Sequence, residues 1–82
     1  MSVKLDMRLV LVRDSDPPKF EFTSNNRTES YSKKDILNWI ANLKGNNDRI
    51  NVGFVMFTSE RSRRLRIAEY FELVLDSAGL LK

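Results

Sequence analysis

The chain has 82 residues, a formal net charge of +3, and neither cysteine nor histidine. This length allows one hydrophobic core and predicts a single domain over residues 1–82, held by packing alone because no disulfide or thiolate zinc site can form. Serine–histidine and cysteine–histidine catalysis are excluded, so we expect no enzyme, cofactor or metal site. With no apolar run of membrane-spanning length and no export signal, the expected location is cytoplasmic, without membrane insertion.

The first third of the chain predicts a β-hairpin. Polar and apolar residues alternate over residues 3–12, the two-residue period of a strand with one buried face. Residues 14–18 form a turn cluster that ends in two prolines, and the alternation resumes over residues 19–23. Residues 24–31 are polar and are expected to form a loop.

A helix is predicted over residues 33–44. Ser32 and Asp35 have the spacing of a capping box, in which each side chain accepts a hydrogen bond from the other residue's backbone. Gly45 is placed to end this helix in the left-handed conformation. The apolar residues that fall on one arc at 100° per residue are Ile36, Leu37, Trp39, Ile40 and Leu43.

A strand is predicted over residues 49–58, followed by a helix over residues 62–78 that Gly79 ends. Both faces of this strand are apolar, which indicates either a central strand or an edge that a partner uses. Gly53 allows a bulge or a close contact. Ile50, Val52, Phe54 and Met56 are expected on one face, and Val55 and Phe57 on the other.

These elements predict an α+β fold with two layers in the order β-β-α-β-α. We expect a mixed sheet of about three strands with two helices packed on one face.

The start of the second helix is basic, which is electrostatically unfavourable because a helix N-terminus carries about half a positive charge. Free backbone N–H groups and guanidinium groups at this place suit an anion. Lys33 and Lys34 repeat the pattern at the first helix, and we expect both helix starts near one edge of the sheet. The leading hypothesis is a regulatory module that binds the phosphate backbone of nucleic acid through Arg61, Arg63, Arg64, Arg66, Lys33 and Lys34.

A structural role for these arginines stays open. On a helical wheel Arg63 and Arg64 point toward the apolar arc, whereas Arg61 and Arg66 point away, so they form no single stripe. They can pair with nearby carboxylates or cover core residues with their stems. The carboxylates of Glu69, Glu72 and Asp76 are interpreted as a solvated face and not as a cation site.

The rival hypothesis is a protein-interaction module or a homodimer. It would use a strand edge or the extra apolar residues of the strands, namely Val10, Val12, Val55 and Phe57.

Two partial resemblances bear on these hypotheses. The segments SKKDILNWIANL, INVGFVMF and LVLDSAGLLK, within residues 32–81, resemble the periplasmic core of the ExbD/TolR family, which implies a role in proton-driven energy transduction but carries over no functional residue. The tail SRRLRIAEYFELVLDSAGLLK is similar to the recognition helix of winged-helix DNA-binding proteins. That resemblance requires a helix in NVGFVMFTS, where the Val, Phe and Gly content favours a strand.

Overall fold

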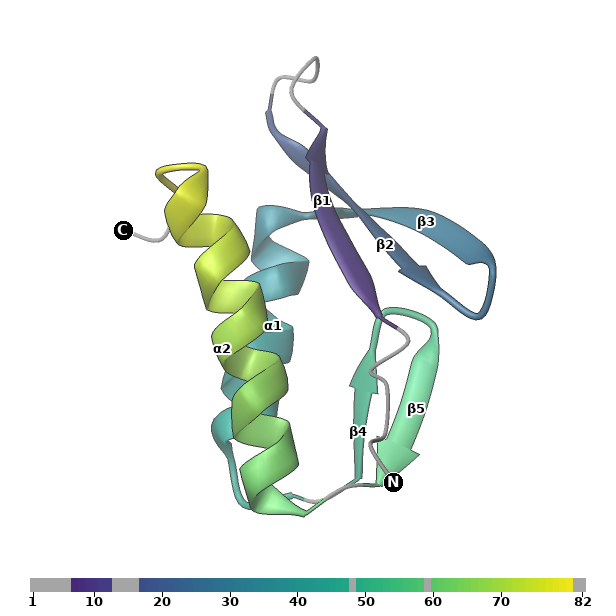
Figure 1. Cartoon of the computed structure of the whole chain (residues 1–82), viewed down its shortest axis with the longest axis vertical. Coiled ribbons are helices and arrows are strands. Elements are labelled where there is room, and N and C mark those ends of the chain that lie inside the picture. The colour runs from purple at the N-terminus through teal and green to yellow at the C-terminus, as the bar shows by residue number, and fades with distance from the viewer. Residues whose placement is uncertain (1–6, 13–16, 48, 59, 81–82) are drawn as a thin grey trace.

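The computed structural model describes residues 7–12, 17–47, 49–58 and 60–80, with the side chain of Phe57 left out. It contains five strands and two helices in the order β-β-β-α-β-β-α (Figure 1). Their bounds are β1 (Arg8–Val12), β2 (Lys19–Ser24), β3 (Arg27–Ser32), α1 (Lys33–Lys44), β4 (Arg49–Val52), β5 (Val55–Thr58) and α2 (Arg61–Ser77).

The α+β class is confirmed, but the strands differ from the mixed sheet of about three that the sequence predicts. The described strands form two antiparallel sheets, one of three strands in the order β1-β2-β3 and one of two strands, β4-β5. The difference arises at two tight turns that the sequence patterns did not reveal.

The first of these turns lies within the expected loop of residues 24–31. Asn25 and Asn26 both have positive φ, 52° and 66°, as the two-residue turns of β-hairpins require. The chain therefore folds back at once into β3, whose residues are mostly exposed. Because β3 has little buried surface, its composition is that of a loop although its backbone is a strand.

The second turn divides the expected strand of residues 49–58 into β4 and β5 at Gly53 and Phe54. Gly53 has a φ of +60°, and a Cβ built on it would lie 2.7 Å from a ring carbon of Phe22. The close contact expected at this glycine is therefore present. In the hairpin register Val55 pairs with Val52, and Phe57 pairs with Ile50. Residues expected on opposite faces of one strand are therefore cross-strand partners in a two-stranded hairpin.

The helix starts and ends follow the sequence, with one exception. The capping box is confirmed: Asp35 N–H donates to Ser32 Oγ at 3.3 Å, and Ser32 N–H donates to Asp35 Oδ2 at 3.2 Å. Gly79, with a φ of +73°, ends α2 as expected. Gly45 is different, because its backbone is extended and not left-handed.

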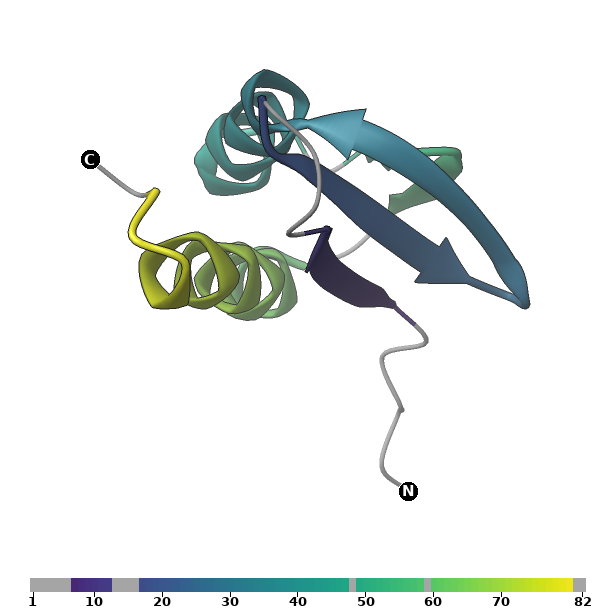
Figure 2. The same ribbon diagram turned by 90° about the horizontal axis from the view of Figure 1, so that it is seen from above.

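The two helices lie side by side on one side of the strands, and they run antiparallel (Figures 1 and 2). The start of α2 lies against the end of α1, since Arg64 donates to the carbonyl oxygens of Leu43 and Gly45. Lys44 also forms an ion pair with Glu72, at 2.6 Å. The expectation that both helix starts lie near one edge is therefore wrong: they are separated by the length of α1, about 18 Å at 1.5 Å per residue.

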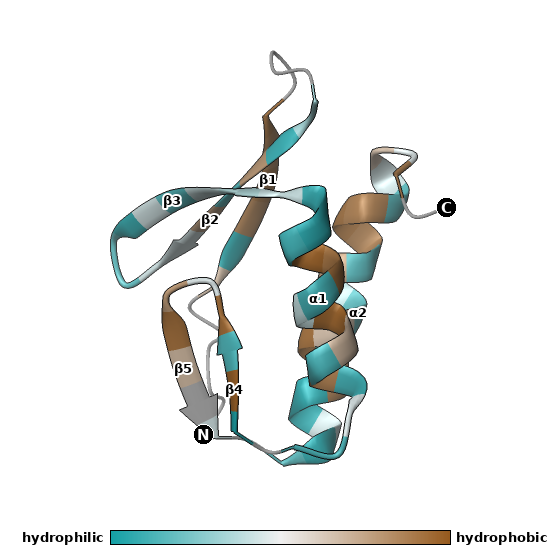
Figure 3. Ribbon diagram, turned by 180° about the vertical axis from the view of Figure 1, so that it is seen from behind, coloured by the Kyte–Doolittle hydropathy of each residue, from teal (hydrophilic) through white to brown (hydrophobic). Residues whose placement is uncertain are grey.

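The core lies between the helices and the strands, and the apolar stretches of β1 and of both helices contribute to it (Figure 3). Phe22 is fully buried at its centre. Its ring makes edge contacts with aromatic rings from β3, α1, the β4–β5 turn and α2. These rings belong to Tyr31, Trp39, Phe54 and Phe71, with centroid distances of 6.4, 5.3, 5.4 and 6.4 Å.

Candidate functional site

The strand β1 lies at an edge of the three-stranded sheet, since it pairs only with β2 among the described strands. Successive residues of a strand direct their backbone N–H and C=O groups to alternate sides. The N–H of Leu9 donates to the hydroxyl of Tyr70 at 2.9 Å, so the backbone groups of Leu9 face α2 and not β2. By the same alternation, the backbone groups of Leu11 face this free edge too.

The last turns of α2 run beside this edge. Tyr70, Val74, Ser77 and Ala78 recur at spacings of four, three and one residues, which places them on one side of the helix. Leu73 lies at the outer margin of the same side, about 160° from the buried Phe71 at 100° per residue. This position explains why 62% of its surface is exposed.

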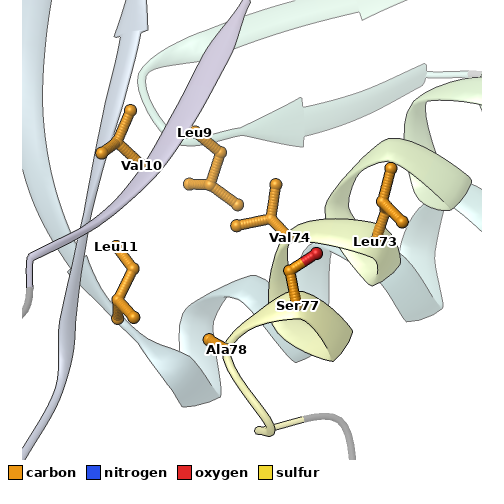
Figure 4. Close-up of a pocket in the computed structure, with 7 residues that line it drawn as sticks. All are labelled: Leu9, Val10, Leu11, Leu73, Val74, Ser77 and Ala78. Atoms are coloured by element: carbon orange, nitrogen blue, oxygen red, sulfur yellow. The ribbon is translucent and has the colours of Figure 1, made fainter.

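An open apolar groove of about 380 Å³ separates β1 from α2 (Figure 4). Its walls are almost entirely aliphatic. The lining residues are Leu9, Val10, Leu11, Leu73, Val74, Ser77 and Ala78. Val10 is 43% exposed, and its side chain lies on the opposite face of β1 from those of Leu9 and Leu11 (Figure 4).

Two carboxylates flank the helical wall of the groove. Glu69 and Asp76 lie four residues before and three residues after Leu73, so their side chains neighbour it on the surface of the helix. Both residues are exposed, and neither makes an ion pair within the described part of the chain. We refer to these two carboxylates, at the outer margin beside Leu73, as the acidic rim; the exposed Arg66 lies three residues before Glu69.

Of the predicted anion-binding residues, Arg64 is committed to the fold. It is buried, and it donates from Nε to Leu43 O at 3.4 Å and from Nη2 to Gly45 O at 3.2 Å. These carbonyls lie at the end of α1, where backbone acceptors have no partner within the helix. The expectation that Arg64 contacts phosphate is therefore corrected, since its guanidinium binds the carbonyl end of another helix.

Arg61, Arg63 and Arg66 are exposed at the start of α2. The first turn of this helix contains no acidic residue, and Glu60 at the N-cap makes no side-chain hydrogen bond to it. Arg49, which the sequence analysis did not single out, lies at the same end, because it pairs with Thr58, three positions before Arg61. The exposed arginines at this end are thus Arg49, Arg61, Arg63 and Arg66, while Lys33 and Lys34 lie at the other end of α1.

The four predicted interface residues have different environments. Val10 lines the groove, and Val12 is half-buried at the end of the same strand. Val55 is half-buried against the core. The side chain of Phe57 lies outside the described residues, although its backbone pairs with Ile50.

Sequence reasoning assigned the other apolar lining residues to the core, or did not single them out. The one local signal for the groove was Leu73, an apolar residue outside the apolar arc of its helix.

The remaining titratable groups show little that suggests chemistry. No three metal-ligating side chains gather among the residues that the structure describes. Of the three carboxylates considered on the last helix, Glu72 forms an ion pair with Lys44. The pKa of Tyr31 is raised, first by burial of its hydroxyl and then by the neighbouring carboxylate of Glu29. Neither helix of the described chain is long and apolar enough to span a bilayer.

Comparisons with known proteins found no matching family model, no similar curated protein and no similar solved structure. The ExbD/TolR resemblance and the cytoplasmic location therefore stay predictions.

Proposed function

We propose that this chain is a non-catalytic module that binds a segment of another protein in the groove between β1 and α2. The observation that carries the proposal is an open groove lined mostly by aliphatic side chains, with the exposed Leu73 at the margin of its helical wall. Leaving large apolar side chains in water forgoes about 25 cal/mol per Å² of burial, so such contiguous exposure is typical of interaction sites.

The size of the groove favours a short segment over a folded partner. Seven residues line it. A stable interface between folded proteins usually takes about 20–30 residues from each side. A peptide segment that inserts its side chains between two walls gains enough contact from such a small surface.

A selection of random 12-residue peptides displayed on phage tests this proposal. We expect the wild-type chain to enrich binders that lose at least about tenfold in affinity for the Leu73→Asp variant, since an apolar contact is replaced by a carboxylate that must lose its hydration. The matched control is Met56→Asp. Met56 is 65% exposed, as Leu73 is 62% exposed, but it lies on β5 and does not line the groove.

Both substitutions are at exposed sites, so they are expected to change the free energy of unfolding by only about 0.5 kcal/mol or less. Loss of peptide binding in Leu73→Asp therefore reports on the groove and not on folding. Binders that tolerate Leu73→Asp as well as they tolerate Met56→Asp, or no enriched binders at all, would refute the groove as the binding site.

The basic start of α2 supports a second candidate function, binding to a nucleic-acid backbone. Arg61, Arg63 and Arg66 are exposed within the first six residues of α2, and the first turn contains no acidic residue. Phosphate contacts of this kind release counterions, so the logarithm of the affinity falls with the logarithm of the salt concentration by about 0.9 for each contact to duplex DNA.

This second candidate is tested by fluorescence anisotropy with a labelled mixed-sequence DNA duplex between about 50 and 300 mM salt, a range over which phosphate contacts weaken strongly. Changing Arg61, Arg63 and Arg66 together to Gln is expected to reduce the salt slope by up to about 2.7, as three lost contacts require. Lys33→Gln with Lys34→Gln, at the far end of α1, is the control and is expected to leave the slope unchanged. Equal slopes for the wild-type chain and the arginine variant would exclude this site.

A further inference from the structure

We propose that the segment bound in the groove adds to the free edge of β1 as a short β-strand, hydrogen-bonded to the backbone of Leu11, and that it bears an apolar side chain between the walls and a lysine or arginine at the acidic rim. This inference rests on the proposed function and specifies its partner: an extended, basic-apolar peptide segment of another protein.

The backbone of β1 provides the hydrogen-bonding groups for such an addition. The bond from Leu9 N–H to Tyr70 Oη fixes which side of the strand is free. On that side lie the C=O of Leu9 and both the N–H and the C=O of Leu11, because the backbone direction repeats every two residues. None of the described residues makes a hydrogen bond to the Leu11 groups at this edge. An exposed strand edge of this kind is a template for another strand.

Tyr70 limits how far the added strand can extend. Its hydroxyl already occupies the N–H of Leu9, so an antiparallel strand that forms both hydrogen bonds with Leu11 meets this hydroxyl two residues further along. The paired part of the peptide is therefore short, on the order of three to five residues, as the length of β1 also requires. This agrees with the small lining of the groove.

The side chains of the walls select the composition of the peptide. The residue opposite Leu11 shares its face of the sheet, so its side chain enters beside Leu11 and Val74, where the mostly aliphatic lining favours an apolar group. Glu69 and Asp76 flank Leu73 on the outer rim and favour a basic side chain there. A strand with alternating apolar and basic residues meets both requirements.

The test is a scan of backbone N-methylation along the tightest 12-residue peptide from the display selection. The peptide residue directly opposite Leu11 donates one N–H to it, so we expect a loss of about tenfold or more at that one position and small effects at its two neighbours. A peptide that binds through side chains alone has no sensitive position, and one that binds as a helix has several adjacent ones. Either result would overturn the strand-addition mode while leaving the groove as the binding site.

Two variants test the assigned roles of the rim and of Tyr70. In Tyr70→Phe the hydroxyl that stops the added strand is removed, so the next facing peptide residue can donate its N–H to the C=O of Leu9. We therefore expect one additional sensitive position, two residues from the first. An unchanged pattern would overturn the limiting role of Tyr70. Selection on Glu69→Gln with Asp76→Asn is expected to remove the enrichment of lysine and arginine, and equal enrichment would contradict the basic partner.

Failure of the groove itself is distinguishable from failure of this inference. If no peptide depends on Leu73, both the proposed function and the inference fall. If the wild-type chain instead forms a dimer that Leu73→Asp dissociates, measured by light scattering, the occupant is a second copy and the peptide partner is refuted.

Discussion

At the residue scale, Arg64 shows how a charged side chain can belong to the core of a small domain. Its guanidinium is buried and donates to two carbonyl oxygens at the end of α1. A guanidinium offers five N–H donors in a fixed fork, so it can serve several acceptors that one ammonium group cannot. Arg64 therefore joins the end of one helix to the start of the other.

We predict that Arg64→Met lowers the free energy of unfolding by about 1–3 kcal/mol, because the carbonyls of Leu43 and Gly45 lose buried donors. Methionine keeps much of the side-chain volume, so the change tests the hydrogen bonds more than the packing. The measurement is urea unfolding followed by the fluorescence of Trp39, with the exposed Arg63→Met as control. A loss no larger than that of the control, about 0.5 kcal/mol or less, would show that these bonds contribute nothing net.

The position of Arg64 on the helical wheel was readable from the sequence, since it points toward the apolar arc of α2. Its partners were not, because they are backbone carbonyls of a different helix. A basic residue that is unfavourable at the start of its own helix can donate hydrogen bonds to the carbonyl end of a neighbouring helix. The sequence pattern of α2 alone cannot distinguish that role from an anion-binding site.

At the element scale, the turn between β4 and β5 depends on Gly53. Its backbone has a φ of +60°, and it passes so close to the ring of Phe22 that a Cβ would lie 2.7 Å from a ring carbon. The glycine thus meets two requirements at once, a left-handed backbone and an approach of the turn to the aromatic centre of the core.

We predict that Gly53→Ala costs about 1–2 kcal/mol for the left-handed backbone and about 1–3 kcal/mol more for overpacking against Phe22. Gly79→Ala is the matched control, because Gly79 has a φ of +73° but nothing within 4 Å of its Cβ position. It is expected to show the backbone cost alone in urea unfolding. Equal losses in the two variants would mean that the ring of Phe22 moves aside without cost.

The helices were predictable from local sequence and the number of strands was not. The capping box at Ser32 and Asp35 and the glycine at position 79 act within a few residues, so their signals are complete in the sequence. The turn at Asn25 and Asn26 leads into a strand with little buried surface, which lacks the alternation that marks a half-buried strand. The hairpin of β4 and β5 looked like one strand because both arms are apolar.

At the scale of the whole molecule, the groove is a product of tertiary structure. One wall comes from residues 9–11 and the other from residues 73–78, so no local pattern contains the site. Val10 was singled out from the sequence as an extra apolar residue. On the opposite wall Val74 and Ala78 had the spacing of core positions, whereas Leu73 lay outside the apolar arc. Only the packing of α2 against β1 shows which of them remain open to a partner.

The antiparallel helices also separate the two basic starts that the sequence analysis had combined. The remaining basic end gathers exposed arginines from α2 and from β4, at the opposite end of α2 from Ser77 and Ala78 of the groove. The two candidate functions therefore use different parts of the surface, and variants at one are expected to leave the other intact.

The hydrogen bond between Leu9 and Tyr70 also bears on the biosynthesis of the protein. The two residues are 61 positions apart, so the backbone N–H of Leu9 in the first described strand finds its partner only in the last helix. A nascent chain can pair β1 with β2 and β3 early, but the free edge and the apolar face of β1 stay uncovered until α2 has been translated. During that interval the emerging sheet exposes more apolar surface than the finished protein does. We therefore expect chaperones to contact β1 before synthesis of the chain is complete.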